Sequence, residues 1–118
     1  MIELDVLREW LKEATWKHKK GPETDYFVWD VSERFPSKAR AFFLRIAPGG
    51  EVHPHVDTCR TTTTHYCIES NDRAVMVFGD EEIRLKPGES RAVDRTVEHY
   101  SYNHGDTDRI HLLVEDFE

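Results

Sequence analysis

The segment Glu51-Val52-His53-Pro54-His55-Val56-Asp57 places two imidazoles and a carboxylate at alternate positions of a predicted strand. Because side chains at positions i, i+2 and i+4 of a strand share one face, His53, His55 and Asp57 are expected to point the same way. Such a face suits a divalent metal, since imidazole and carboxylate groups are common metal ligands. It equally suits the solvent-facing side of an edge strand, where Pro54 is tolerated. The segment alone leaves both interpretations open.

A later histidine favours the metal interpretation. His99 opens another predicted strand, after the turn-like run 94–98. In a jelly roll, an early and a late strand lie close together near one mouth of the barrel, so His99 is expected to meet His55 and Asp57. Two histidines and one carboxylate occupy one face of an octahedral metal and leave three positions open, as in non-haem Fe(II) oxygenases. The spacing therefore predicts a metal site made by His55, Asp57 and His99.

A cationic side chain stands ten positions after His99. Arg109 begins the run Arg109-Ile110-His111-Leu112-Leu113-Val114, which otherwise has the composition of a core strand. On the inner face of a barrel, a guanidinium needs a buried anion, and the carboxylate of a ligand, held by two parallel hydrogen bonds, would supply one. At the end of the strand, the same arginine would pair with Asp106 or Asp108 at the surface. The residues alone leave both roles open.

The elements that must position these residues are predicted to be mainly β. Residues 3 to about 19 predict one helix, which Gly21-Pro22 ends. The apolar stripe of this helix recurs at three- and four-residue spacing: Val6, Leu7, Trp10, Leu11 and Ala14. The rest of the chain predicts short strands over 25–31, 40–46, 51–57, 61–69, 74–78, 82–85, 90–93, 99–102 and 109–114. Strands at this spacing, with Gly, Pro, Asn and Asp between them, are typical of an antiparallel sandwich or barrel of jelly-roll type.

Length and charge narrow the classes of function. A chain of 118 residues suits one domain, with an N-terminal helix over 1–20 and a jelly-roll core over 21–118. Its formal net charge of −7 argues against non-specific binding to nucleic acid or to anionic membranes. No signal peptide or membrane-spanning run is predicted, and two cysteines are too few for a disulfide scaffold. We therefore expect a reduced, cytoplasmic protein.

Taken together, these motifs resemble those of the Fe(II)/2-oxoglutarate-dependent oxygenases, and most closely the aspartyl/asparaginyl β-hydroxylase branch, which also includes bacterial proline hydroxylases. The resemblance covers residues 40 to 116, and its specific part is the HxD…H…R order with ten positions from His99 to Arg109. It is carried by Arg45-Ile46-Ala47-Pro48-Gly49-Gly50, His55-Val56-Asp57, 94–99, Asn103 and Arg109-Ile110-His111-Leu112. The family implies a double-stranded β-helix, the cupin-like form of the jelly roll.

The resemblance also implies roles for individual residues. His55, Asp57 and His99 would hold Fe(II), and Arg109 would bind the distal carboxylate of the co-substrate 2-oxoglutarate. Two further residues, His65 and Thr63, would help to hold this co-substrate; they share one face if 60–67 is a strand, although a threonine-rich strand also arises from β-propensity alone. The implied reaction hydroxylates an amino acid, free or within a peptide and of Asp, Asn or Pro type, and yields succinate and CO2. The aspartyl hydroxylase itself lacks the HxD carboxylate, so this chain follows the more general triad.

Two other functions are open. A cupin-type metal-binding protein, either an isomerase, a different dioxygenase or a metabolite binder, would use His53, His55 and His99. The cupin pattern expects a glutamate soon after its HxH motif, where Asp57 comes too early and Glu69 too late, and it gives Arg109 no role. The third alternative is a metal-free jelly-roll interaction module. The expected partner is a small-molecule or peptide substrate, and the oligomeric state is not predicted.

Overall fold

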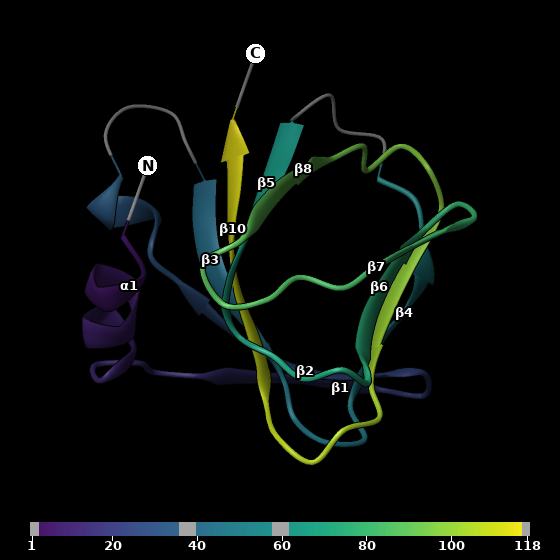
Figure 1. Cartoon of the computed structure of the whole chain (residues 1–118), viewed down its shortest axis with the longest axis horizontal. Coiled ribbons are helices and arrows are strands. Elements are labelled where there is room, and N and C mark those ends of the chain that lie inside the picture. The colour runs from purple at the N-terminus through teal and green to yellow at the C-terminus, as the bar shows by residue number, and fades with distance from the viewer. Residues whose placement is uncertain (1–2, 36–39, 58–61, 117–118) are drawn as a thin grey trace.

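The chain folds into one curled antiparallel sheet with a single α-helix among the residues that the computed structural model describes, 3–35, 40–57 and 62–116. Around the sheet the strands follow the order β7-β6-β9-β4-β2-β3-β10-β5-β8, and β1 pairs with β2. The strands are β1 (Lys17–Gly21), β2 (Thr24–Asp30), β3 (Arg40–Ile46), β4 (Glu51–His55), β5 (Thr62–Glu69), β6 (Ala74–Phe78), β7 (Glu81–Ile83), β8 (Ser90–Val93), β9 (His99–Asn103) and β10 (Arg109–Asp116). Curling brings the wall of β3, β10, β5 and β8 opposite the wall of β4, β6 and β7 (Figure 1). The predicted mainly-β jelly roll with one helix is confirmed.

The N-terminal helix is shorter than predicted. Helix α1 spans Leu4–Leu11, and Lys17–Gly21 is a strand, so the prediction of helix over 1–20 is wrong beyond its first half. The charged run 17–20 has no apolar stripe to pack on the core, whereas its backbone pairs fully with 25–28. Gly21 and Pro22 therefore begin the turn of a hairpin rather than end a helix. A short 3₁₀ turn, η1 (Ser32–Arg34), precedes β3.

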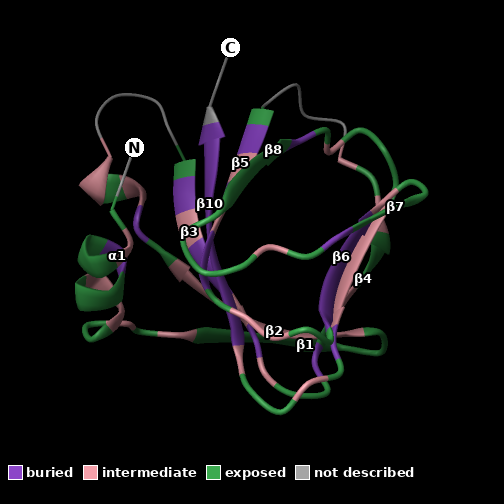
Figure 2. Cartoon of the chain, viewed as in Figure 1, coloured by how far each residue is buried: buried purple, intermediate pink, exposed green. Residues whose placement is uncertain are grey.

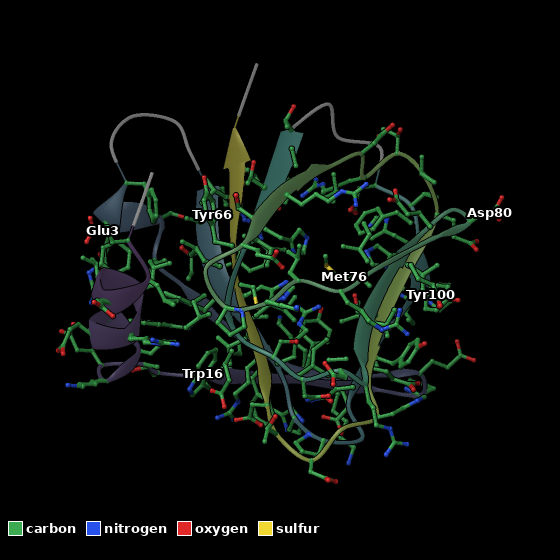
Figure 3. All side chains as sticks on the ribbon, viewed as in Figure 1. Glu3, Trp16, Tyr66, Met76, Asp80 and Tyr100 are labelled. Atoms are coloured by element: carbon green, nitrogen blue, oxygen red, sulfur yellow. The ribbon has the colours of Figure 1, made fainter. Side chains whose placement is uncertain are left out.

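Strand β10 of the first wall buries both of its faces. On β10, Ile110, Leu112 and Val114 face outward into an apolar cluster that includes Leu7 of α1. Tyr66 of β5 and Trp16 also pack on this outer cluster (Figure 3). The alternate residues of β10 face the interior of the barrel, and the strand is buried throughout Arg109–Glu115 (Figure 2). The odd-numbered residues of β10 therefore face the interior of the barrel, whether they are polar or apolar.

The interior is apolar at its sides and polar where the site lies. Leu44, Ile46 and Leu113 form one apolar cluster, and Met76 points from β6 towards the interior in a second one with Ile83 (Figure 3).

No described helix has the length and apolar character needed to cross a membrane. Cys67 is a buried free thiol, and burial raises its pKa to about 11. Cys59 lies outside the described residues.

The turn from β3 to β4 fixes β4 beside β9. The Gly49 N–H donates to the carbonyl of Asn103 at 2.8 Å, and the Asn103 N–H donates to the carbonyl of Gly50 at 3.1 Å. Gly49 has a φ of 83°, a left-handed conformation that glycine adopts without strain. At Gly50 a Cβ atom would lie 2.6 Å from the carbonyl oxygen of Asp25, so this position has no room for a side chain. These contacts set the register that brings the ends of β4 and β9 together.

Candidate metal centre and ligand cavity

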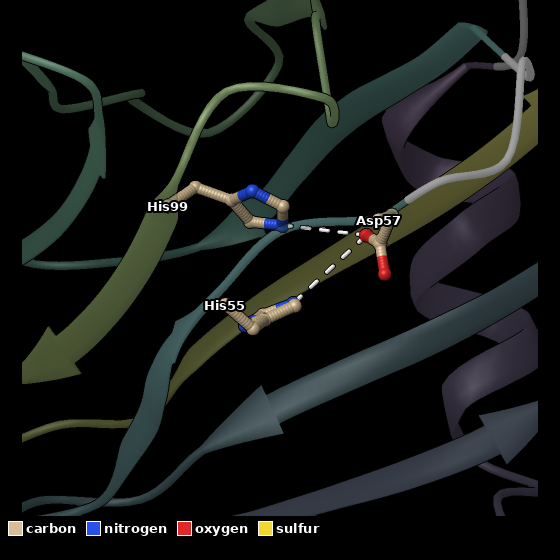
Figure 4. Close-up of side chains that lie close together, drawn as sticks. All are labelled: His55, Asp57 and His99. Carbon is tan, nitrogen blue, oxygen red and sulfur yellow. Dashed lines mark ion pairs between the residues drawn. The ribbon is translucent and has the colours of Figure 1, made fainter.

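Two histidines from strands distant in sequence lie opposite each other. In the β4–β9 pair, His55 is the direct partner of His99, and their ring centroids are 4.2 Å apart. The register of this pair shifts between Val52 and His55. Asp57 follows two residues after the end of β4, and its backbone N–H donates to the Arg95 carbonyl at 3.0 Å. The Asp57 carboxylate faces the two rings (Figure 4).

The three side chains converge closely enough to share one ion. Asp57 Oδ2 lies 3.5 Å from His99 Nε2 and 3.9 Å from His55 Nε2 (Figure 4). One potential ligand atom from each residue lies within 4.8 Å of the others, a grouping of His, Cys, Asp or Glu found once among the residues the structure describes. The sequence-predicted set of His55, Asp57 and His99 is thus brought together in space.

The hydrogen bonds of the two imidazoles leave the correct nitrogens free for a metal. Nδ1 of His55 lies 2.7 Å from the carbonyl oxygen of His53, and Nδ1 of His99 lies 2.8 Å from that of Val97. A carbonyl only accepts, so Nδ1 carries the hydrogen and Nε2 keeps its lone pair. Burial lowers the pKa of His99, which favours the neutral ring. Two lone pairs and a carboxylate facing one another repel unless a cation lies between them, so this donor set fits a divalent metal.

Two charged residues outside the predicted set hold Asp57 in place. Arg95 Nε lies 3.5 Å from Asp57 Oδ2, and the same guanidinium forms an ion pair with Glu115, which is almost fully buried. Phe78 stacks on the His99 ring with centroids 4.8 Å apart. No sequence pattern points directly to Arg95 as a site residue. The predicted strand 109–114 is too short, because β10 continues to Asp116 and Glu115 follows the inward alternation from Arg109.

A cavity of about 430 Å³ connects this centre to Arg109. His55, Asp57 and His99 line it together with Arg109 and His65, whereas Thr63 does not. Its apolar lining comes from β2, β3, β4, β6 and β10: Tyr26, Val28, Phe42, Leu44, Val52, Phe78 and Leu113. Exposed charged side chains lie where it opens: Lys19 and Arg40. His53 also lines the cavity but is exposed and lies outside the three-residue group, with its ring 5.3 Å from that of His55.

Arg109 is a buried cation without a protein partner. Its side chain is 2% exposed, and neither Nε nor Nη1 has a hydrogen-bond acceptor. Burial lowers the pKa of this guanidinium to about 10. Arg109 therefore does not pair with Asp106 or Asp108 at the surface. A buried guanidinium with free N–H groups lining a cavity fits the carboxylate of a ligand, which accepts two hydrogen bonds at once.

Three polar residues accompany Arg109 in the same wall. Thr63 is fully buried, and its hydroxyl lacks a partner. His65, 7% exposed, lies with its Nδ1 3.1 Å from Nδ1 of His111, which is 1% exposed. Burial, reinforced by the Arg109 charge, lowers the pKa of His65 to about 3 and that of His111 well below its usual value. Both rings are therefore neutral in the folded protein.

These two buried histidines should make the fold less stable in mild acid. The unfolded chain binds a proton at each histidine near pH 6.5, whereas the folded chain does not until far lower pH. The stabilisation is thus complete above pH 6.5 and is lost as the pH falls towards the folded pKa of about 3 at His65. Between pH 7 and pH 5 we expect the free energy of unfolding to fall by about 2 kcal/mol for each histidine.

Urea unfolding of the metal-free protein at several pH values measures this slope. The variant His104→Asn, which changes an exposed loop histidine, should leave it unaltered. His65→Phe should remove about half of it. A profile that is flat from pH 7 to pH 5 would contradict the burial of two neutral rings.

Comparison with known proteins places the whole arrangement in a family. A sequence model described as aspartyl/asparaginyl β-hydroxylase matches residues 6–118. No curated protein matches the chain. Similar solved structures include a predicted oxalate decarboxylase from Thermotoga maritima, with 21% identity and a TM-score of 0.70 over 91% of this chain and 96% of that chain. A cupin 2 conserved barrel domain protein from Rhodopseudomonas palustris has 10% identity and a TM-score of 0.70, over 87% of this chain and 71% of that chain. The cupin_2 domain of an XRE family transcriptional regulator from Enterobacter cloacae has 15% identity and a TM-score of 0.64, over 79% and 97%.

Proposed function

The chain belongs to the aspartyl/asparaginyl β-hydroxylase family, and on this basis we propose that it is an Fe(II)- and 2-oxoglutarate-dependent dioxygenase. Its substrate is an amino acid of Asp, Asn or Pro type, either free or within a peptide. In the reaction, 2-oxoglutarate, O2 and a substrate C–H group yield succinate, CO2 and a C–OH group. The observation that carries the proposal is one cavity lined both by the His55, Asp57 and His99 group and by the unpartnered guanidinium of Arg109.

Three residues of the chain would hold the iron. His55 and His99 offer Nε2, and Asp57 offers Oδ2, so the donor set supplies two neutral ligands and one negative charge. A set of two histidines and one carboxylate leaves coordination positions open for other ligands. Bound Fe(II) would supply the redox chemistry that activates O2. Arg95, tied to Glu115, contacts the same Asp57 oxygen, Oδ2, and would help to keep the carboxylate in place.

The opposite part of the cavity would bind the co-substrate. Arg109 would take the distal carboxylate of 2-oxoglutarate, which relieves the buried guanidinium of its missing acceptors. His65 offers one further polar atom to the same cavity. Apolar residues such as Phe42 and Leu113 line the same cavity, and they would exclude water from the reacting groups. The substrate would enter at the open side, beside Lys19 and Arg40.

A cupin-type metal site is the second candidate, and one observation favours it. His53 lines the same cavity, and its ring lies 5.3 Å from the His55 ring, so a rotation of this exposed side chain would bring it near the centre. In that case His53 would replace Asp57 as the third ligand, and Arg109 would have no role in binding a co-substrate. This function would be an isomerase or a metabolite binder.

The proposed function is tested by mixing the protein anaerobically with Fe(II) and 2-oxoglutarate. We expect a visible charge-transfer absorption that appears only when both are present, because the 2-oxo acid chelates the iron. Two controls should give no band: succinate, which lacks the 2-oxo group, and Zn(II), whose filled d shell has no readily oxidised electron. Amino acids and peptides are then screened for stimulated release of succinate. Absence of the band in a protein that binds Fe(II) would refute the proposal.

A further inference from the structure

A pair of buried histidines behind the cavity shares one hydrogen bond. His65 of β5 and His111 of β10 face each other across neighbouring strands, with 3.1 Å between their Nδ1 atoms. The rings are nearly perpendicular, at 83°, so the contact joins two nitrogens rather than two stacked faces. Because both rings are neutral, each carries one hydrogen, and one Nδ1 must donate to the other. Two arrangements satisfy this condition.

In the first arrangement His65 donates. The hydrogen of His111 then sits on its Nε2, an atom that is fully buried and has no partner. An unpartnered buried N–H group is costly and rare in folded proteins. This arrangement also leaves His65 with a bare lone pair on Nε2, the nitrogen that remains for the cavity, and a lone pair repels an anionic ligand held by Arg109.

In the second arrangement His111 donates. Its Nε2 is then an unprotonated nitrogen, which tolerates the absence of a partner better than an N–H group does. His65 accepts at Nδ1 and therefore carries its own hydrogen on Nε2. The wall of the cavity then offers hydrogen-bond donors from both His65 and Arg109.

We propose that His111 is a positioning residue that fixes the tautomer of His65, so that His65 and Arg109 both present hydrogen-bond donors to the cavity and together select an anionic oxygen ligand. His111 does not line the cavity, and it acts through His65 alone. The identification of that anion with a carboxylate of 2-oxoglutarate rests on the proposed function. The position of the two hydrogens does not.

The hydrogen positions are read by NMR of the metal-free protein labelled with ¹⁵N at histidine. Two-bond ¹H–¹⁵N correlations distinguish an imidazole protonated at Nε2 from one protonated at Nδ1. We expect His65 to be protonated at Nε2 and His111 at Nδ1. The reverse assignment, or two rings protonated at the same type of nitrogen, would overturn the proposal. No metal or 2-oxoglutarate is present in this experiment, so its result does not depend on whether the proposed function is correct.

Two variants test the consequence for binding. His111→Asn keeps an amide N–H close to the place of Nδ1, whereas His111→Leu removes the donor. With Leu, we expect 2-oxoglutarate to bind to the Fe(II)-loaded protein about tenfold or more weakly, because a hydrogen bond to a charged group is lost, while Fe(II) affinity stays the same. With Asn, binding should return to within about threefold of the unaltered protein.

The pattern among the variants decides between positioning and packing. Equal weakening in Asn and Leu variants would show that His111 acts only by filling space, and it would overturn the proposal. If the Leu variant does not fold, the Asn variant and the NMR of the unaltered protein still decide whether His111 fixes the tautomer of His65. His104→Asn, at an exposed loop position, is the matched control and should change nothing. An unaltered protein that binds Fe(II) without binding 2-oxoglutarate would refute the proposed function but leave the tautomer result in place.

Discussion

Replacing Arg109 with methionine should make the metal-free protein more stable and at the same time remove its binding of 2-oxoglutarate. The guanidinium is buried, and two of its three nitrogens have no acceptor. Burial has already lowered its pKa to about 10, which reflects the cost of keeping the charge away from water. Methionine fills much of the same volume without a charge, so we expect the free energy of unfolding to rise by about 1 to 4 kcal/mol.

The same substitution removes the group that would pair with the distal carboxylate of the co-substrate. Losing one partner of a buried ion pair costs about 3 to 5 kcal/mol, which corresponds to a loss of affinity of about 100-fold or more. Fe(II) binding should change little, because Arg109 is not part of the His55, Asp57 and His99 group. Urea unfolding measures the stability, and anaerobic titration of the Fe(II)-loaded protein with 2-oxoglutarate measures the affinity.

The matched control is Arg45→Met. Arg45 is another arginine of the sheet, half-buried rather than buried; its guanidinium stacks over Trp16 and Phe27, and the residue does not line the cavity. Its replacement should leave the affinity for 2-oxoglutarate unchanged. If Arg109→Met instead lowers the stability and weakens Fe(II) and 2-oxoglutarate equally, Arg109 is a structural residue and the cavity is not built for a diacid.

Turn residues made much of the sheet predictable from sequence. The strands at 40–46, 74–78 and 90–93 begin and end where they were predicted, because Gly, Pro, Asn or Asp residues bound them on at least one side. The position of Arg109 at the start of a core-like strand suggested two roles, at the interior or at the surface, and in the structure it is buried and lines the cavity. These features depend on a residue and its close neighbours in the chain, which a sequence displays directly.

Features that depend on distant partners were harder to predict. Strand β1 has an unremarkable charged sequence, and it is a strand because β2 pairs with it across a tight turn. The expected common face of His53, His55 and Asp57 assumed one regular strand. In the structure the register of β4 shifts and the strand ends at His55, so Asp57 reaches the group from beyond the strand, while His53 stays exposed outside it. The links from Arg95 to Glu115 and from His65 to His111 join elements whose proximity only the folded sheet creates.

The identity of the third metal ligand separates the two candidate functions, and Asp57→Ala and His53→Ala measure it. Asp57 contributes the single negative charge of the three-residue group, and its Oδ2 is the atom that both Nε2 nitrogens approach. Changes to residues that merely support a ligand weaken metal binding by about 10- to 100-fold, so loss of the carboxylate itself should cost about 100-fold or more. His53→Ala should change Fe(II) affinity by less than about threefold, because this exposed side chain lies outside the group.

Fe(II) affinity is measured anaerobically by competition with a chelator, and the charge-transfer band with 2-oxoglutarate gives a second reading of the same site. Asp57→Ala should lose both signals, and His53→Ala should retain both. Urea unfolding of each metal-free variant checks that the loss is local, since Arg95 keeps its buried partner Glu115 when Asp57 is removed. The opposite result, with metal lost in His53→Ala and kept in Asp57→Ala, would assign the site to the cupin ligand set of His53, His55 and His99. Unchanged Fe(II) affinity in both variants would show that these side chains converge for a reason other than metal binding.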